Sequence, residues 1–545
     1  MIFDTVLLDS PERQARDRAH WPNKTMHDFL TESVESAPDK VAFIGYRTDW
    51  DSPLKLTYRE LDEAVNTIGR ALLAKGIQRH DVVSIQLPNW WQALAMTLAC
   101  TRIGAVTNPL MPIFRDRELT YMLGLCEAKM IVIPQQFRGF NYPEMLERIH
   151  SDLPKLEHVI VVEGETDNSF DALLALGNQL QKEGQPFEPQ PLAPNDVQCI
   201  KYTSGTTGNP KGVMHTSNTL MAAMESLRER LGIDSSTVAL AGSPVGHMSG
   251  YLMLSLLPVR LGATTVYVDI WDPKKAMELA VKENITYTVG STPFLTDMIQ
   301  LVEQGMPAPP KLRSFLCAGA PIPPVQIDKA RELLNLGVTS SYGATEAPGA
   351  TLTEPERAHD KSATSDGRAA AGWEIRIVDD SGHPLPALDE GRIQVRGAAL
   401  FGGYLKHPEL NDVDSDGWFD SGDLGFLDHD GYVRVSGRSK DIIIRGGENI
   451  PVAEVEAEIA RHAAVAAVAV VGYPDSRLGE RAAAYISLKP GSTLSMADMQ
   501  QHLEQAHMAK QYWPEKLEIV EEMPLTPTGK IQKFKLRELA KTLGD

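Results

Sequence analysis

Apolar positions in the first part of the chain recur with either a helical or a strand-like spacing. Residues 57–76 predict an amphipathic helix, because a capping box of Thr57 and Glu60 can start it and Gly76 can end it. Residues 91–104 predict a second helix. Short β-branched runs predict strands at 81–87, 128–133, 158–164, 263–269 and 286–291. Strands that alternate with helices indicate an α/β fold with several layers and largely parallel sheets.

The pattern changes after about residue 370. Residues 391–397 and 431–437 alternate apolar with other residues, as half-exposed strands do, and glycine becomes frequent. From Pro451 onward, the spacing predicts a compact α+β unit of helices and strands. We therefore predict a large N-terminal domain with a β-rich subdomain, residues 1–439, and a small C-terminal domain, residues 440–545.

Composition and charge narrow the classes of protein. Hydrophobic residues make up 43% and charged residues 23% of the 545 residues, as in ordinary soluble globular proteins. A net charge of −19 argues against broad binding to nucleic acid or to an anionic membrane surface. It leaves room for a local basic pocket that holds an anionic small molecule.

The N-terminus and the cysteines indicate the compartment. The stretch MIFDTVLLDSPERQ has no basic segment before its apolar run, and no apolar run reaches the roughly 18 residues of a membrane span. We therefore expect a cytoplasmic protein. The cysteines form no CxxC pair and argue against a disulfide framework or a zinc site; they are Cys100, Cys126, Cys199 and Cys317.

The stretch YTSGTTGNPKG, residues 202–212, is the first candidate for chemistry. Its glycines allow close backbone approach, its hydroxyls and N–H groups can donate to phosphate oxygens, and Lys211 adds a positive charge. A strand is predicted before it and a helix at 218–230 after it, the geometry of phosphate capture at a helix N-terminus. The P-loop spacing is absent, which disfavours a P-loop phosphotransferase. A flexible surface loop is the other interpretation.

Two further stretches carry groups that suit a nucleotide. In SYGATEAPG, Tyr342 offers an aromatic face and Glu346 a carboxylate of the kind that binds Mg²⁺ beside phosphates. In the acidic stretch 417–441, Asp423 can accept both hydroxyls of a ribose, and Arg438 can donate to ribose or phosphate. A calcium loop is the alternative for this stretch, but the DxDxDG spacing is missing.

A lysine near the C-terminus is held between residues that restrict the backbone. In PLTPTGKIQK, two prolines and a glycine precede Lys530, and a helix is predicted after it. Lys530 is therefore either an ordinary solvated charge or a side chain that enters the site of another domain.

Five stretches, in order and over nearly the whole chain, resemble the adenylate-forming acyl-CoA synthetase superfamily: YTSGTTGNPKG, YGATE, SGDLG, GRSKDIIIRGGENI and PTGK. Bacterial ligases for short- and medium-chain fatty acids or for cyclohexanecarboxylate look most similar. The resemblance implies ATP, Mg²⁺ and coenzyme A. It also implies two steps: a carboxylate attacks the α-phosphorus of ATP to give acyl-AMP and pyrophosphate, and after rotation of the mobile C-terminal domain the CoA thiol displaces AMP.

The same resemblance implies roles for individual residues. Lys530 is the catalytic lysine, Glu346 the magnesium ligand, and Lys440 the hinge. Pantetheine passes over Gly447, and the neighbouring Gly446 is a further cofactor-binding residue that flanks the hinge. The residues implied to bind ATP are Thr203, Ser204, Gly205, Thr206, Thr207, Gly208, Lys211, Gly319, Ala320, Pro321, Tyr342, Gly343, Thr345, Asp423 and Arg438. Arg445 and Arg477 are candidates for the CoA nucleotide.

The segment 242–252 bears on the acid. His247 matches a family position that gates the carboxyl end, although a lone histidine is more often a structural residue. Amino-acid-activating relatives use an Asp here, and none lies between Gly242 and Tyr251. This favours a short or medium, aliphatic or alicyclic acid, with an aromatic acid still open.

Several alternatives and partners also remain open. The acceptor could be a carrier protein in place of CoA, and a luciferase-like oxygenase and a nucleotide-binding regulator are further alternatives. Pro524 with Gly529 and Lys530 resembles the pattern at which related ligases are acetylated, which implies a lysine acetyltransferase as a partner. A homodimer is a further possibility.

Overall fold

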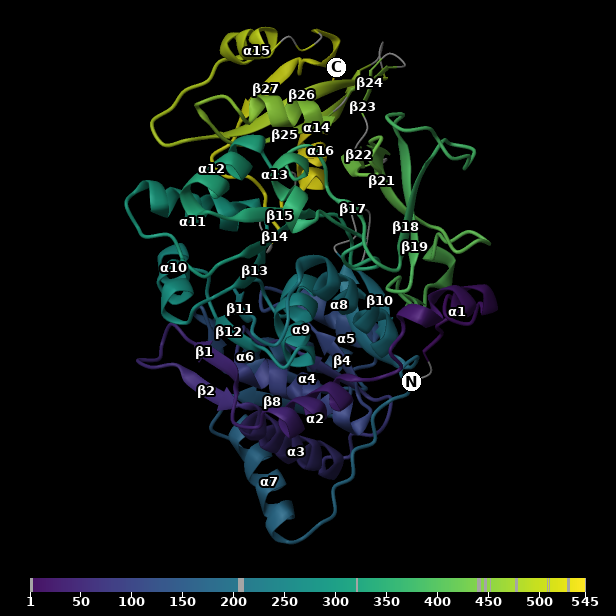
Figure 1. Cartoon of the computed structure of the whole chain (residues 1–545), viewed down its shortest axis with the longest axis vertical. Coiled ribbons are helices and arrows are strands. Elements are labelled where there is room, and N and C mark those ends of the chain that lie inside the picture. Colours follow the sequence, from purple (N-terminus) through teal and green to yellow (C-terminus); the bar gives the residue numbers. More distant parts are fainter. Residues whose placement is uncertain are drawn as a thin grey trace.

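The architecture was obtained as a computed structural model. It describes residues 3–203, 210–319, 322–438, 443–445, 448–450, 452–475, 479–506, 508, 510–526 and 530–544. Figure 1 shows a large body that contains the N-terminal and middle parts of the chain, and the C-terminal elements at one end of it.

In the described part of the chain, one seven-stranded sheet has the order β15-β14-β13-β11-β12-β1-β2. Its strands are parallel except for β2, which pairs antiparallel with β1. The loops that follow β11, β13, β14 and β15 therefore meet at one edge. The bounds are β1 (Val41–Tyr46), β2 (Leu54–Thr57), β11 (Val238–Ala241), β12 (Thr264–Val268), β13 (Tyr287–Gly290), β14 (Ser314–Ala318) and β15 (Gly337–Ser341).

A second sheet has, among the described residues, seven strands in the order β20-β10-β9-β4-β3-β5-β8. From β9 to β8 its strands are parallel, whereas β10 runs antiparallel to both β9 and β20. The bounds are β3 (Val82–Ile85), β4 (Val106–Pro109), β5 (Met130–Pro134), β8 (His158–Val162), β9 (Val197–Thr203), β10 (Lys211–Thr216) and β20 (Gly403–Tyr404).

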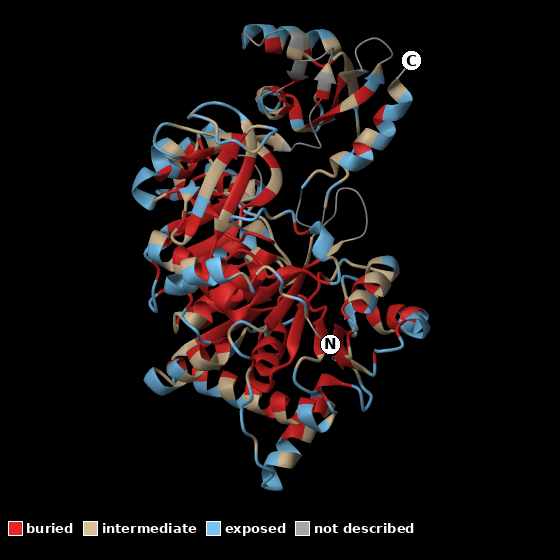
Figure 2. Ribbon diagram, turned by 90° about the vertical axis from the view of Figure 1, so that its right-hand side faces the viewer, coloured by how far each residue is buried: buried red, intermediate tan, exposed pale blue. Residues whose placement is uncertain are grey.

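The largest hydrophobic core contains residues of both sheets together with α3 (Tyr58–Ala74), α4 (Trp91–Ile103) and α8 (Ser217–Leu231). The helix α3 starts at the predicted capping box of Thr57 and Glu60. The helix α4 is buried on nearly every face, as expected of a helix inside a core. Figure 2 shows the buried residues concentrated along the strands of the large body.

The other helices cover the sheets or join strands. The α-helices of the large body are α1 (Pro11–Asp17), α2 (Met26–Ser36), α5 (Asp116–Leu125), α6 (Tyr142–Ile149), α7 (Phe170–Lys182), α9 (Leu257–Arg260), α10 (Pro273–Lys282), α11 (Thr292–Glu303), α12 (Pro324–Leu334) and α13 (Ala358–Lys361). A π-helix, η3 (Ser249–Leu256), precedes α9. Short 3-10 helices are η1 (Arg18–His20), η2 (His150–Asp152), η4 (Pro355–Arg357), η5 (Pro408–Leu410), η7 (Lys510–Tyr512) and η8 (Lys541–Leu543).

The glycine-rich stretch after residue 370 forms an antiparallel sheet in the order β18-β19-β21-β22. Its strands are β18 (Trp373–Val378), β19 (Gly391–Gly397), β21 (Phe419–Leu427) and β22 (Val433–Arg438). Two short strand pairs are β6 (Gln136–Phe137) with β7 (Phe140–Asn141) and β16 (Thr351–Leu352) with β17 (Arg368–Ala369).

The C-terminal elements have a sheet and cores of their own. Their strands are β23 (Ile443–Arg445), β24 (Glu448–Ile450), β25 (Val465–Asp475), β26 (Gly479–Leu488) and β27 (Lys516–Ile519). Their α-helices are α14 (Val452–Ile459), α15 (Met496–Gln505) and α16 (Lys533–Ala540). Two clusters of buried side chains lie on this sheet. The predicted boundary residue, Lys440, lies outside the described residues.

The predicted α/β class, with a large domain of largely parallel sheets and a smaller C-terminal domain, is confirmed. The cysteines are free thiols, and all are buried. A search of the described helices found none that is long and apolar enough to cross a membrane.

Candidate active site

The carboxyl ends of four strands, three in the first sheet and one in the second, bring the predicted site residues together. The loops after β11, β14 and β15 carry His247, Gly319 and Tyr342 in turn. In open α/β sheets, ligands bind outside the carboxyl ends of the strands. The second sheet contributes the carboxyl end of β9, where Thr203 lies.

The predicted phosphate loop connects two strands rather than a strand and a helix. Lys211 opens β10, whose register with β9 pairs it with Thr203. The expectation of a strand, loop and helix was therefore wrong, because β10 lies between the loop and α8. The hydroxyl of Thr203 is buried and has no hydrogen-bond partner among the described residues, which suits a group that receives a ligand. Outside the described residues lie Ser204, Gly205, Thr206, Thr207 and Gly208.

Tyr404 connects Lys211 and Glu346, and no sequence motif pointed to it. The ammonium of Lys211 donates to the Tyr404 hydroxyl at 2.6 Å, and that hydroxyl donates to Oε1 of Glu346 at 2.6 Å. Burial, together with the charge of Glu346, raises the pKa of Tyr404, so the hydroxyl keeps its proton. Glu346 itself is only 6% exposed. A lysine, a tyrosine and a carboxylate thus form one hydrogen-bonded chain.

Tyr342 and Asp423 also meet, although 81 positions separate them in the sequence. The Tyr342 hydroxyl donates to Oδ2 of Asp423 at 2.7 Å, and Asp423 is buried. The ring of Tyr342 is half-buried at the sheet edge. Arg438 is the register partner of Asp423 on the adjacent strand, but its side chain lies outside the described part of the structure.

Contacts of the backbone, rather than of side chains, hold the stretch around Gly343 and Thr345 in place. A Cβ built on Gly343 would lie 2.7 Å from the carbonyl oxygen of Ala347, so a side chain does not fit there. The carbonyl of Thr345 accepts a hydrogen bond from Nε2 of the buried His215 at 2.7 Å. Burial lowers the pKa of His215 to about 4.

Lys530 extends from the C-terminal part to the strand end at Gly319. A Cβ built on Gly319 would lie 3.0 Å from Cε and 3.3 Å from Nζ of Lys530. Gly319 has a φ of +91°, which favours glycine. The lysine is held at a turn, since its N–H donates to the Thr526 hydroxyl at 3.0 Å and its carbonyl accepts from the Thr526 N–H at 2.6 Å. Ala320 and Pro321 lie outside the described residues.

His247 is half-buried beside two lysines. Burial, together with the positive charges of Lys530 and Lys201, lowers the pKa of His247 to about 3. Its Nδ1 accepts the backbone N–H of Ser249 at 3.3 Å and lies 2.9 Å from the Ser249 hydroxyl. The proton of the neutral ring is therefore on Nε2, which can donate to an anion. Lys201 was not among the residues selected from the sequence. The only sign of it there is a charged side chain within the strand predicted before the phosphate loop.

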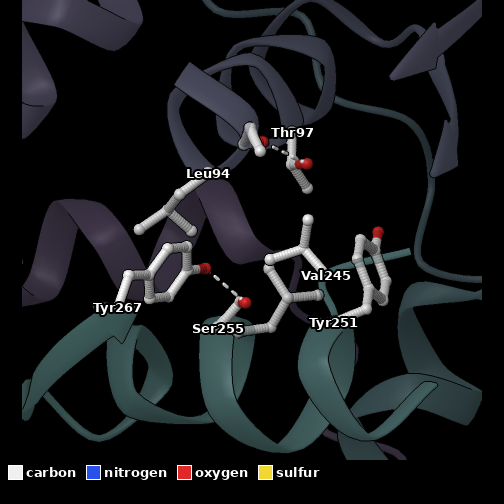
Figure 3. Close-up of a pocket in the computed structure, with 8 residues that line it drawn as sticks. Leu94, Thr97, Val245, Tyr251, Ser255 and Tyr267 are labelled. Atoms are coloured by element: carbon white, nitrogen blue, oxygen red, sulfur yellow. Dashed lines mark hydrogen bonds between the residues drawn. The ribbon is translucent and has the colours of Figure 1, made fainter. Parts of the chain in front are cut away.

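A small cavity of about 10 Å³ lies behind this loop. Figure 3 shows Leu94 and Thr97 of α4 on one side and Val245 and Tyr251 on the other. Tyr267 donates to the Ser255 hydroxyl across its floor. The cavity is large enough for about one water molecule.

We expect Gly250→Ala to destabilise the fold. A Cβ at this position would lie 2.1 Å from the carbonyl oxygen of Pro244, so the loop that carries His247 must shift. Overpacking of this kind costs about 1–3 kcal/mol, measurable by urea denaturation. Gly124→Ala in α5 is the control, since nothing lies within 4 Å of its added Cβ. Equal stability of Gly250→Ala and the wild type would contradict the expectation.

The residues predicted to serve coenzyme A are mostly outside the described structure: Gly446, Gly447 and Arg477. The predicted hinge, Lys440, lies outside it as well. Arg445 is half-buried, and its guanidinium forms an ion pair with Glu515 at 2.5 Å. No group of three or more histidine, cysteine or acidic side chains in the described residues could hold a metal ion.

Comparison with known proteins identifies the class. Residues 30–405 match the AMP-binding enzyme family, and residues 454–530 match the AMP-binding enzyme C-terminal domain. The chain belongs to the AMP-binding enzyme family, and it is a ligase of the adenylate-forming kind. The resemblance drawn from five sequence motifs is thereby confirmed.

Two curated relatives and one solved structure illustrate the similarity. The medium-chain fatty-acid–CoA ligase of Escherichia coli (strain K12) is 34% identical over 540 residues, which cover 98% of this chain and 94% of the relative. The salicylyl-CoA synthase/salicylate adenylyltransferase of Streptomyces sp is 30% identical, with coverages of 97% and 96%. The anthranilate CoA ligase AuaEII in complex with anthranoyl-AMP has a TM-score of 0.85 at 25% identity, with coverages of 96% and 98%.

Proposed function

We propose that this ATP-dependent acyl-CoA ligase activates a medium-chain aliphatic or alicyclic carboxylic acid, such as cyclohexanecarboxylate. The placement of Lys530 over Gly319, beside His247, carries the proposal, because it puts a positive charge where an acid and a phosphate would meet. The absence of an acidic side chain from residues 242–251 favours a neutral acyl group over an amino acid. The similarity to a medium-chain fatty-acid–CoA ligase supports the chain length.

The first step joins two anions, so the site must offset negative charge. Lys530 would neutralise charge that develops on the α-phosphate, and the neutral His247 would donate Nε2–H to the acid. Thr203 and Lys211 would contact the outer phosphates. Tyr342 would stack on adenine, with Gly319 and Gly343 along it, and Asp423 would accept the ribose hydroxyls.

The residues present fit a magnesium ion bound with ATP. Mg²⁺ usually takes one or two carboxylates together with phosphate oxygens. Glu346 is a buried carboxylate whose orientation is fixed by Tyr404, and it lies in one hydrogen-bonded chain with Lys211. Glu346 would hold the ion, and the bound ion would supply positive charge to the leaving pyrophosphate.

In the second step, the CoA thiol must reach the acyl carbon, so residues of the C-terminal part that serve adenylation must give way to residues that serve CoA. We propose a hinge at Lys440, which divides residues 1–439 from a mobile unit 440–545, with Gly446 and Gly447 along the pantetheine path. Hinges are short segments that absorb large backbone rotations. Arg445 and Arg477 are the candidates for the CoA nucleotide.

The test is a thioester assay with ATP, Mg²⁺ and CoA over a panel of carboxylates. We expect the highest kcat/KM for a medium-chain or alicyclic acid. A preference for salicylate-like aromatic acids would overturn the proposed substrate class, but the assignment as an acyl-CoA ligase would stand. Acyl transfer only to a phosphopantetheinylated carrier protein would identify an adenylation enzyme that loads a carrier. Oxygen consumption would indicate a luciferase-like oxygenase. ATP binding without release of pyrophosphate would indicate a nucleotide-binding regulator.

Regulation and assembly add further proposals. We propose that a lysine acetyltransferase modifies Lys530, which is exposed and whose charge adenylation requires. Mass spectrometry of the native protein that finds Lys530 unmodified, beside an acetylated relative, would count against this. A cytoplasmic location and a homodimer remain predictions from the sequence.

Tyr404→Phe should reduce adenylation about fivefold to tenfold, because it removes the hydroxyl that orients Glu346, a net effect of about 1 kcal/mol. The apparent affinity for Mg²⁺ should fall in parallel, as measured by pyrophosphate release over a magnesium titration. Tyr46→Phe is the matched control, since Tyr46 donates to Glu283 at 2.6 Å elsewhere in the fold. An unchanged magnesium dependence of Tyr404→Phe would remove Tyr404 from the site.

A further inference from the structure

A buried lysine lies beneath the loop that carries His247, and none of the site motifs includes it in a role. Lys201 lies on β9 and is 2% exposed. Among the described residues, no carboxylate forms an ion pair with it. Burial lowers its pKa to about 8. An ammonium buried without a counter-ion is unfavourable for folding, so its contacts need an account.

The ammonium of Lys201 contacts the loop before η3 and η3 itself. Its Nζ donates to the carbonyl of Gly246 at 2.6 Å and lies 3.5 Å from the carbonyl of Val245. It also lies 4.7 Å from the centre of the Tyr251 ring. Both carbonyls come immediately before His247 in the chain. Lys201 therefore connects β9, which leads into the predicted phosphate-binding loop, to the loop that carries His247.

Other contacts hold the same loop. The side chain of Asn89 accepts from the N–H of Val245 at 2.9 Å and donates to the carbonyl of Ser243 at 3.0 Å. A Cβ on Gly246 would lie 2.7 Å from the carbonyl oxygen of Leu110 and from the N atom of Met111, so the backbone packs directly on that segment. The N–H of His247 donates to the carbonyl of Pro244 at 2.9 Å, which closes a tight turn. The backbone position of His247 therefore follows that of residues 244–246, and Ser249 holds the Nδ1 of its ring.

We propose that Lys201 is a positioning residue for the acid: it fixes the carbonyls of Val245 and Gly246 and so places the Nε2–H of His247 against the substrate carboxylate. The inference rests on the proposed function, and it adds a residue outside the site motifs.

The test compares Lys201→Met with the wild type by pyrophosphate release and by thermal unfolding. Met fills similar space without donors or charge. We expect the KM for the acid to rise at least tenfold, the KM for ATP to change less than threefold, and the melting temperature not to fall. Lys201→Gln retains an N–H donor and should recover part of the affinity for the acid.

Lys40→Met is the matched control. Lys40 also donates to two loop carbonyls, those of Ser235 and Gly262, but it lies away from the strand ends of the site. We expect this variant to keep the wild-type KM for the acid.

A double-mutant cycle tests whether Lys201 acts through His247. In a His247→Ala background, Lys201→Met should add less than a twofold change, whereas independent effects would multiply. Equal rises in both KM values, a full additional effect in the cycle, or no recovery with Gln would overturn the proposal. Should Lys201→Met fail to fold, Lys201→Gln alone decides through the same split of KM values. A wild type that activates no carboxylate would instead refute the proposed function.

Discussion

Lys530→Ala should reduce formation of the acyl-adenylate by about 10²–10³-fold, the usual effect of removing one preorganised positive charge or donor from a transition state. The expectation follows from the position of its Nζ, next to Gly319 at the carboxyl edge of the first sheet. The measurement is pyrophosphate release with saturating acid and ATP.

Two comparisons make this prediction specific. Thioester formation from chemically synthesised acyl-AMP and CoA should change only a few-fold in Lys530→Ala, since adenylation is then bypassed. Lys535→Ala, which removes an exposed lysine of α16, should behave like the wild type in both assays. Undiminished pyrophosphate release by Lys530→Ala would remove this residue from the proposed catalytic role.

Glu346→Gln should lower the rate of adenylation by about 10²-fold and shift the magnesium dependence to higher concentration, because the carboxylate charge is lost while the shape is kept. The amide oxygen can still accept from Tyr404, so the fold should remain intact. Pyrophosphate release over a magnesium titration gives both quantities.

The control for this substitution is another carboxylate with a tyrosine partner. Glu354 accepts from the Tyr432 hydroxyl at 2.6 Å, as Glu346 accepts from Tyr404. Glu354→Gln should therefore leave the magnesium dependence unchanged per folded molecule. If both variants show the same dependence on magnesium, Glu346 is not the metal ligand.

The elements that followed a regular hydrophobic period were predictable. The helix α3 begins at the capping box expected from Thr57 and Glu60. Five parallel strands, β3, β5, β8, β12 and β13, fall on the five predicted apolar runs, whereas β1, β4, β11, β14 and β15 were not among those runs. The strand β10 was missed because KGVMHT has no clear alternation, and its burial comes from pairing with β9 and with Tyr404. The π-helix η3 was missed because a mostly apolar segment of eight residues shows no clear helical period.

The site was predictable only where residues form contiguous motifs. Glu346 and Lys530 stand within recognisable stretches, and their roles remain predictions for the assays above. Tyr404 and Lys201 stand in no such stretch, and their partners lie 58 and 45 positions away in the sequence. Pairings at such separations arise from tertiary packing, which a local pattern does not encode.

The lysine contact between β9 and the His247 loop bears on how substrate range could be re-engineered. Exchanging residues 242–256 with those of a relative would transfer the loop and η3 without the segments that contact them. The carbonyls of residues 245 and 246 face the ammonium from residue 201, and Gly246 packs against the backbone at residues 110 and 111. The smallest transferable specificity module is therefore discontinuous, and grafts that carry all three segments should retain activity where single-loop exchanges lose it.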